Sequence, residues 1–410
     1  MTFLYNLGIS LYTLLAQLAA IFNPKARLFV RGRKNWLSGL QSRIDPGARY
    51  LWFHCASLGE FEQGRPVIEA IRQQFPEYQI ALTFYSPSGY EIRKNYPQAD
   101  LVCYLPADTR RNARRFLDTL RPEKAFFIKY EFWFHYITGL QERQIPLFLV
   151  SGIFRENQVF FRQTPWGKWY ARLLTGFEHF FVQDAASAQL LQQAGITRVT
   201  VSGDTRFDRV AAIAAAAKNI PLVEKFKDGK PVVVAGSSWK PDEELLTRFI
   251  NQHTGLKFII APHEVSQVNL NRLEQLLKKP AIRFSQVSEN EVQNFEVLII
   301  DSIGMLSSLY RYGDFAYIGG GFGVGIHNIL EAATFGLPVV FGPNYRKFRE
   351  ARELVAAGGA FSIATYEELE HIFRSLSASS ANLQAASQTA AGYVKNNTGA
   401  TEIIINRVFC

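Results

Sequence analysis

The sequence predicts an α/β fold of two tandem Rossmann-like, doubly wound domains facing a cleft. The first observation is length, because 410 residues exceed what one ordinary hydrophobic core accommodates. The second is an alternation of short apolar runs with longer amphipathic stretches, which is typical of parallel sheets covered by helices on both faces. The third is a break in this alternation at residues 209–228, where we predict a linker.

Each strand is predicted from a run rich in Phe, Val, Ile or Tyr that ends in polar or turn residues. The runs of the first domain are "YLWFHCAS", "YQIALTFY", "LVCYLP", "KAFFIKY", "IPLFLVSG", "HFFVQD" and "RVTVSG". Those of the second are "KPVVVAGSS", "KFIIAPHE", "EVLIID", "FAYIGGG", "LPVVFG" and "AFSIA". Ligands of open α/β sheets bind outside the carboxyl ends of the strands. We therefore expect the chemistry in the loops that follow these runs.

The first 24 residues predict a membrane-associating helix, because residues 1–22 are apolar for about the length that spans a bilayer. Their polar residues fall on one stripe of a helix, at Asn6, Ser10, Thr13 and Gln17. Basic residues follow at once, which predicts a cytoplasmic location for the rest of the chain: Lys25, Arg27, Arg31, Arg33 and Lys34. The pattern leaves open whether the helix spans the membrane or lies in its interface. The alternative is a helix buried against the first domain.

The charge balance indicates an anionic partner, since the net charge is +9 and the pI about 9.3. The aromatic residues are concentrated in the apparent strands and the first helix, not interleaved with Lys and Arg, which argues against nucleic acid. The three cysteines lie far apart, so neither a disulfide framework nor a zinc site is expected. No Asp-x-Asp pair occurs. We expect no metal and no cofactor.

The stretch "IGGGFGVGIHNILEAATFGLPVVFGP" (318–343) joins a strand to a helix through several glycines. Bare backbone N–H groups at such a joint bind anions such as phosphate. Glu331, one turn into the helix, could accept both hydroxyls of a ribose, so the joint predicts a nucleotide site. The alternative is a capping box formed by Asn328 and Glu331.

This stretch is similar to the "GG…GGHN-LE-A-GPV–GP" signature of the Kdo transferases, the inverting GT-B glycosyltransferases of lipopolysaccharide biosynthesis. Further segments resemble family motifs in the same order along the chain: "WFHCASLGEFEQG", "TFYSPSGYE", "GDTRFD", "GSSWKPDEE" and "DSIGMLSSLY". The segment "GSSWKPDEE" is similar to the family motif "xSTHxGEE". "FIKYEFWFH" keeps Glu131 and Trp133 of "METELWPN" but changes Lys129 and His135, "APHEVSQ" lacks an Arg, and Met305 replaces a common Glu.

The resemblance implies transfer of 3-deoxy-D-manno-octulosonic acid (Kdo) from CMP-Kdo to a lipid A precursor, lipid IVA, on the cytoplasmic side of the inner membrane. The anionic membrane surface is then a further partner, and the basic clusters at 31–34 and 110–115 are suited to lipid phosphates. A solvated charged face is the alternative for both clusters. The rival functions are another GT-B nucleotide-sugar transferase or epimerase, and a non-catalytic membrane-binding protein.

On the acceptor side, Glu60 ends "CASLGE" at a predicted helix start, where it is either a general base or a carboxylate that favours the helix dipole. The resemblance assigns it the catalytic role. Predicted acceptor-binding residues are Ser57, Gly59, Glu131 and Arg33. Predicted donor-binding residues are Ser237, Ser238, His263, Gly304, Gly320, Gly321, Asn328 and Glu331.

The predicted boundaries follow from these assignments. Residues 1–24 form the membrane-associating helix, 25–208 the acceptor domain, 209–228 the linker and 229–392 the CMP-Kdo domain. Residues 393–410 are expected to form a helix that packs back on the first domain.

Overall fold

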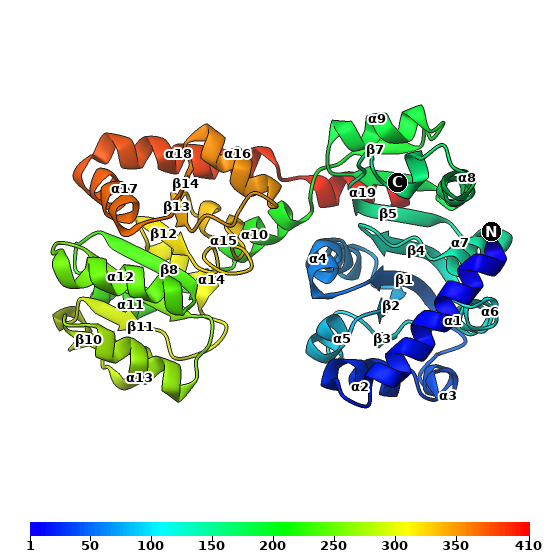
Figure 1. Ribbon diagram of the computed structural model, residues 1–410, viewed down its shortest axis with the longest axis horizontal. Coiled ribbons are helices and arrows are strands. Elements are labelled where there is room, and N and C mark those ends of the chain that lie inside the picture. The colour runs from blue at the N-terminus through cyan, green and yellow to red at the C-terminus, as the bar shows by residue number, and fades with distance from the viewer. The chain divides into compact units, whose positions relative to one another are not determined.

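The computed structural model describes residues 1–410, which form two compact units. Unit 1 comprises residues 1–209 and 398–410, and unit 2 comprises residues 210–397. Each unit contains one seven-stranded sheet in which all neighbouring strands are parallel (Figure 1). The predicted fold class of two parallel, doubly wound sheets is confirmed.

The sheet of unit 1 has the order β3-β2-β1-β4-β5-β6-β7. Its strands are β1 (Arg49–Cys55), β2 (Tyr78–Phe84), β3 (Leu101–Tyr104), β4 (Pro122–Ile128), β5 (Leu147–Gly152), β6 (His179–Val182) and β7 (Val199–Val201). Its helices are α1 (Thr2–Ala19), α2 (Pro24–Arg31), α3 (Trp36–Gln41), α4 (Leu58–Gln74), α5 (Pro87–Arg93), α6 (Arg110–Leu120), α7 (Phe134–Glu142), α8 (Pro165–Ala171), α9 (Ala185–Gln193) and α19 (Ala400–Phe409). Helix α10 (Arg206–Ala215) crosses from unit 1 into unit 2.

The sheet of unit 2 has the order β10-β11-β9-β8-β12-β13-β14. Its strands are β8 (Val232–Ser238), β9 (Lys257–Pro262), β10 (Ala281–Arg283), β11 (Val297–Ile299), β12 (Phe315–Ile318), β13 (Val339–Phe341) and β14 (Ala360–Ser362). Its helices are α11 (Pro221–Lys227), α12 (Lys240–Gln252), α13 (Gln267–Leu276), α14 (Leu306–Leu309), α15 (Leu330–Ala333), α16 (Arg349–Ala357), α17 (Tyr366–Ala378) and α18 (Ser380–Asn396). Strand β10 was not among the predicted strands, because its residues Ala, Ile and Arg include only one large apolar side chain.

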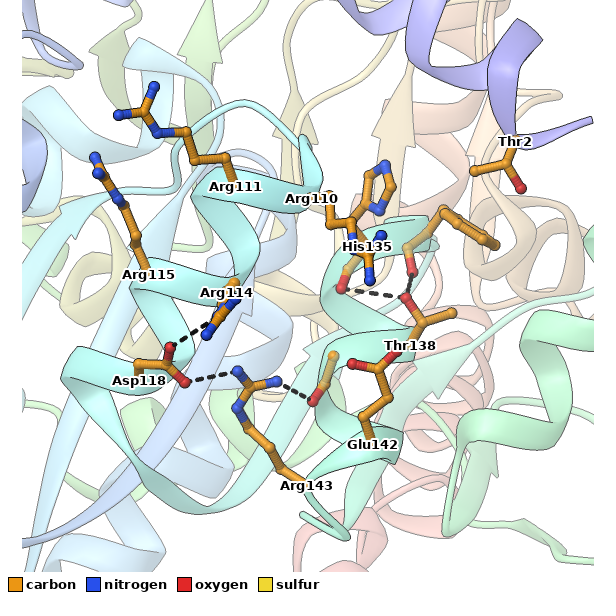
Figure 2. A pocket seen from close by; sticks show the side chains of 12 residues that line it. Thr2, Arg110, Arg111, Arg114, Arg115, Asp118, His135, Thr138, Glu142 and Arg143 are labelled. Atoms are coloured by element: carbon orange, nitrogen blue, oxygen red, sulfur yellow. Dashed lines mark hydrogen bonds and ion pairs between the residues drawn. The ribbon is translucent and has the colours of Figure 1, made fainter.

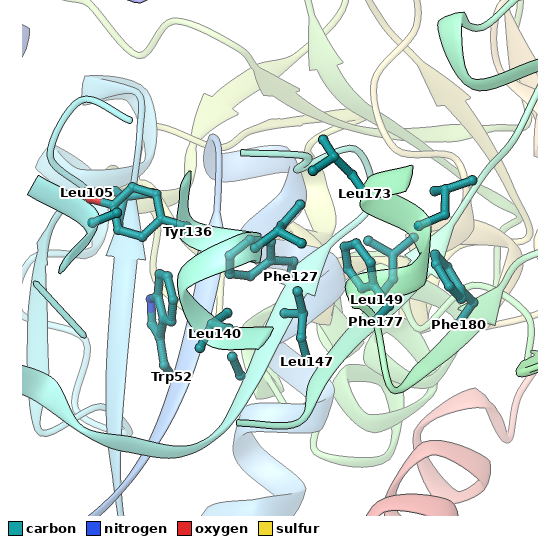
Figure 3. Close-up of a cluster of buried hydrophobic side chains, with 14 of the residues drawn as sticks. Trp52, Leu105, Phe127, Tyr136, Leu140, Leu147, Leu149, Leu173, Phe177 and Phe180 are labelled. Carbon is teal, nitrogen blue, oxygen red and sulfur yellow. The ribbon is translucent and has the colours of Figure 1, made fainter. Parts of the chain in front are cut away.

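The apolar runs form central strands because both faces of each sheet are buried. Successive side chains of a strand point to opposite faces. In β1, Trp52 belongs to the cluster on one face, which Figure 3 shows, while Leu51 and Phe53 belong to the cluster on the other. All three are fully buried. This two-sided burial explains why the strands read as continuous rather than alternating hydrophobic runs.

Helix α19 belongs to unit 1, although the whole of unit 2 precedes it in the sequence. The ring of Phe409 stacks on Phe75 at the end of α4, with centroids 4.3 Å apart. Ile404 and Ile405 are part of the hydrophobic cluster beneath. Asp208 accepts hydrogen bonds from the backbone N–H groups of Gly399 and Thr401, each 2.6 Å long, and so caps the helix.

Helix α1 lies along unit 1 from α7 to α2 (Figure 1). Tyr5 is its one buried residue, while most of its large apolar side chains are exposed: Phe3, Leu4, Leu7, Leu11, Leu14, Leu15 and Leu18. Their spacing places them on one face of the helix. No helix in the chain has both the length and the apolar character that crossing a bilayer requires.

Candidate active site

The sequence 57–60 forms the start of α4 directly after strand β1. Ser57 is the N-cap residue, and its hydroxyl accepts a hydrogen bond from the backbone N–H of Gly59. The carboxylate of Glu60 accepts hydrogen bonds from the hydroxyl and the backbone N–H of Ser57, the latter 3.1 Å long. Both contacts use Oε2. The structure thus shows the capping role of Glu60 and leaves Oε1 available to a substrate hydroxyl.

Glu131 lies in the irregular segment 129–133 between β4 and α7 and is 7% exposed. Its Oε2 accepts a 2.6 Å hydrogen bond from Nε1 of Trp133 and lies 3.1 Å from Nε2 of His54. The other ring nitrogen of His54 lies 2.9 Å from the hydroxyl of Thr83. This buried network holds the carboxylate at the end of strand β4.

The two carboxylates lie at the same edge of the sheet, at the ends of the neighbouring strands β1 and β4. The charges of both carboxylates act on the buried thiol of Cys55, the last residue of β1. Burial raises its pKa well above the usual value, and the negative charges of Glu60 and Glu131 raise it further. The structure therefore brings Ser57, Gly59, Glu60 and Glu131 into one region of unit 1.

Arg33 lies near this region but is engaged with the protein itself. Its Nε, Nη1 and Nη2 donate to the carbonyl oxygens of Leu105, Phe29 and Tyr85, at 2.9, 3.0 and 2.7 Å. Its guanidinium also lies 3.7 Å from the centroid of the Phe29 ring. These contacts tie α2 to the ends of strands β2 and β3. Contact of Arg33 with an acceptor stays a prediction.

In unit 2, the glycine-rich crossing forms a loop, residues 319–328, that we call the glycine loop. Asp242, 1% exposed, accepts hydrogen bonds from the backbone N–H groups of Gly320 and Trp239, both 2.9 Å long. Its other oxygen accepts one from the hydroxyl of Tyr317 at 2.8 Å. Gly320 has φ +91°, which favours glycine. A Cβ on Gly321 would lie 2.6 Å from Gly342, so the close packing there requires glycine.

Three rings stack at the glycine loop, and one of them, that of His327, belongs to the loop. Trp239 and His263 have centroids 4.3 Å apart, and those of His263 and His327 are 4.7 Å apart. Nε1 of Trp239 donates to Nε2 of His327 at 3.0 Å. Burial lowers the pKa of His327, and the neighbouring His263 lowers it further. This imidazole is therefore a neutral acceptor near pH 7.

Asn328 and Glu331 interact with each other, since Nδ2 of Asn328 donates to Oε1 of Glu331 at 3.1 Å. Oδ1 of Asn328 accepts from the backbone N–H of Leu330 at 3.2 Å. The N-cap residue of α15 is Ile329, and the helix has only four residues. The alternative given to the nucleotide site, a capping box with Asn328 as the N-cap residue, is therefore not formed.

The remaining predicted donor residues are placed differently from one another. Ser237 and Ser238 end strand β8, whereas α12 begins only at Lys240. The hydroxyl of Ser238 donates to the buried Glu243 at 3.1 Å. Ser237 has φ +53°, a strained conformation for serine at the end of a strand. Gly304 is exposed, with φ +93°. No three His, Cys, Asp or Glu side chains are grouped so that they could hold a metal ion.

The comparisons with known proteins bear on both units. The family model described as 3-deoxy-D-manno-octulosonic-acid transferase (kdotransferase) matches residues 28–209. A 3-deoxy-D-manno-octulosonic acid transferase of Haemophilus influenzae is 24% identical over 88% of this chain and 87% of its own length. That of Aquifex aeolicus is 26% identical over 78% of this chain and 83% of its own. The chain is a relative of the Kdo transferases.

Solved structures with a similar fold include enzymes outside the Kdo transferases. The UDP-GlcNAc 2-epimerase of Neisseria meningitidis, bound to UDP-GlcNAc, has a TM-score of 0.59 at 15% identity and covers 87% of this chain and 98% of its own. MurG of Acinetobacter baumannii has a TM-score of 0.55 at 14% identity and covers 88% and 99%. At these identities the likeness is one of fold.

Several residues that hold the candidate site in place were not predicted from the sequence of this Kdo transferase relative. They are His54, Thr83, Trp239 and Asp242. Trp239 stands where the family motif has His, so the motif comparison could have singled it out. Asp242 carried no sequence signal beyond its place in the first turn of a helix.

Proposed function

We propose that the chain transfers Kdo from CMP-Kdo to a hydroxyl of a lipid A precursor, with inversion at the anomeric carbon. The observation that carries the proposal is the placement of Glu60 and Glu131 at the ends of adjacent strands in the unit that matches the transferase family model. The sequence relationship to Kdo transferases supports the donor and the acceptor class.

Glu60 is the proposed general base. Its Oε1, which accepts no hydrogen bond from the protein, accepts the proton of the acceptor hydroxyl, while Ser57 holds Oε2. The acceptor oxygen forms a bond to the anomeric carbon of Kdo as the bond from that carbon to the phosphate oxygen breaks. CMP leaves with the bonding electrons. General-base assistance of this kind accelerates a reaction by about 10²–10⁴-fold.

Glu131 is the proposed acceptor ligand. Its Oε2 is already held by Trp133, so the second oxygen remains to accept a hydrogen bond from a sugar hydroxyl. A carboxylate accepts such bonds more strongly than a neutral group does.

The glycine loop is the proposed binding segment for the donor phosphate. Asp242 holds the loop by the backbone N–H of Gly320. The N–H groups of Gly319, Gly323, Gly325 and His327 donate to backbone carbonyl oxygens, so the proposed anion donors are the other N–H groups of the loop. CMP has a single phosphate, whose charge requires less compensation than that of a nucleoside diphosphate. The Trp239–His263–His327 stack supplies a planar surface beside it.

The membrane interface is the proposed location. The exposed apolar face of α1 is suited to insertion among lipid headgroups. Near its first residues, a cavity of about 830 Å³ lies between α6 and α7 (Figure 2). Asp118 pairs with Arg143 and Arg114 there, whereas Arg110, Arg111 and Arg115 form no ion pair. We propose that these three arginines attract lipid phosphates.

The test is mass spectrometry of the products formed from CMP-Kdo and a defined lipid A precursor. The expected products are CMP and an acceptor enlarged by one or more Kdo residues. Binding of UDP without binding of CMP, measured by saturation-transfer NMR, would contradict the proposal.

A further inference from the structure

Helix α1 contacts the site that holds Glu131, in addition to exposing an apolar face. The ring of Tyr12 stacks on Tyr85, with centroids 6.3 Å apart and planes at 29°. The ring of Tyr85 lies 4.6 Å from that of Trp133. Trp133 in turn donates the 2.6 Å hydrogen bond to Glu131. Three successive contacts thus lead from α1 to the carboxylate.

A second set of contacts joins α1 to the residues that follow Trp133. Oδ1 of Asn6 lies 2.6 Å from Nε2 of His135, and the hydroxyl of Tyr5 accepts a 3.3 Å hydrogen bond from the backbone N–H of Phe134. The same hydroxyl donates to the buried Asp108. Helix α1 is therefore linked to Trp133 in two ways. Tyr85 lies between Tyr12 and the side chain of Trp133, and Tyr5 contacts the backbone of the next residue, Phe134.

Glu131 depends on such neighbours because its own backbone is irregular. Residues 129–133 belong to no helix or strand, and Lys129 has φ +70°, an uncommon conformation for a residue with a side chain. The carboxylate is oriented by side chains, those of His54 and Trp133. Movement of the Trp133 ring would release one of these two.

We propose that Tyr12 is a positioning residue that holds Glu131 in place through Tyr85 and Trp133. The helix that faces the lipid is then also part of the acceptor site, and its docking on unit 1 completes that site. The inference rests on the proposed function, in which Glu131 binds the acceptor.

The test uses the full chain with a lipid A precursor in detergent micelles, so that membrane attachment does not limit the rate. We expect Tyr12→Ala to lower kcat/KM for the acceptor about 5-fold, as expected when one hydrogen bond is weakened, with an unchanged KM for CMP-Kdo. Tyr12→Phe, which keeps the ring, should restore activity. Gln17→Ala, an exposed position on the same helix, is the matched control and should have no effect.

A double-mutant cycle tests the route. Trp133→Phe keeps a ring against Tyr85 but removes the N–H group that binds Glu131. In the Trp133→Phe background, adding Tyr12→Ala should lower kcat/KM for the acceptor by less than about 2-fold, because the two changes act through one contact. Three results would overturn the positioning role. The first is that the losses in kcat/KM of the two single variants multiply fully in the double variant, and the second is full activity of the Tyr12→Ala variant. The third is a KM for CMP-Kdo that rises as much as kcat/KM for the acceptor falls. Absence of turnover by the unmodified chain would contradict the proposed function instead.

Discussion

Asp242 accepts a hydrogen bond from the backbone N–H of Gly320 across 2.9 Å, which ties the start of α12 to the glycine loop 78 positions later in the chain. The same carboxylate binds Trp239 and Tyr317. The proposed phosphate-binding loop is therefore held by a buried acceptor that satisfies three donors at once.

Asp242→Asn is expected to loosen the glycine loop, because one amide oxygen cannot replace two carboxylate oxygens. A buried donor without a partner costs about 1–3 kcal/mol, and we expect a loss of that size in the free energy of unfolding, together with weaker CMP-Kdo binding. Thermal melting and calorimetric titration measure the two effects. Glu244→Gln, on the same helix and mostly exposed, is the control and should change neither.

Glu60→Gln should separate catalysis from capping. Glutamine at this position can still pair with Ser57 in a capping box, so the melting temperature should hardly change, while turnover should fall about 10²-fold or more. Ser57→Ala removes the cap and keeps the base, and is expected to cost about 1 kcal/mol of stability. Steady-state kinetics and melting curves of both variants decide, and near-normal turnover of Glu60→Gln would remove Glu60 from the mechanism.

Glu331→Ala should weaken donor binding more than folding. As a ribose ligand the carboxylate contributes about 1.5–3 kcal/mol, which corresponds to roughly 10- to 150-fold in affinity. As a partner of Asn328 in a four-residue helix, it contributes less than about 1 kcal/mol to stability. Titration with CMP-Kdo and a melting curve on the same variant separate the roles. A lower melting temperature with unaltered affinity would leave only the structural one.

Replacement of Leu7, Leu11 and Leu15 by serine together should weaken binding to anionic vesicles by about 10²-fold or more, since each buried leucine contributes about 1.5–3 kcal/mol. Each of the three is more than half exposed, so the melting temperature should stay close to that of the unmodified chain. Vesicle co-sedimentation at high salt is the measurement. These substitutions are a cleaner test than deletion of residues 1–22, which would also remove Tyr5 from its contact with Asp108.

Asp108 should make the protein less stable as pH rises from about 4 to about 6. Burial raises the pKa of this carboxyl to about 6, above its unfolded value of about 3.9. In this range the folded state binds more protons than the unfolded state, so stability falls with increasing pH and levels off above the folded pKa. Chemical denaturation between pH 4 and 7.5 should show this slope in the unmodified chain and a smaller slope in the Asp108→Asn variant. Equal slopes would contradict the assignment.

The sequence revealed the strands well, because buried parallel strands such as β1 and β8 carry uninterrupted apolar runs that a single pass can recognise. It revealed the glycine loop for a similar reason, since glycines concentrated at one joint are visible without a structure. Strand β10 was missed because Ala281–Arg283 contains only one large apolar side chain. The roles of His54 and Asp242 escaped because their partners, Glu131 and Gly320, lie 77 and 78 positions away. Contacts at that distance depend on the fold and leave no local pattern.

Because helix α19 belongs to unit 1, the last part of unit 1 is synthesised only after the whole of unit 2. Unit 2 is one continuous stretch, residues 210–397, whereas unit 1 needs residues 398–410 to fill its core with Ile404 and Ile405. On the ribosome, unit 2 can therefore reach its final packing while unit 1, begun first, still has an open hydrophobic surface beside α4. A nascent chain arrested before residue 398 would expose that surface to chaperones.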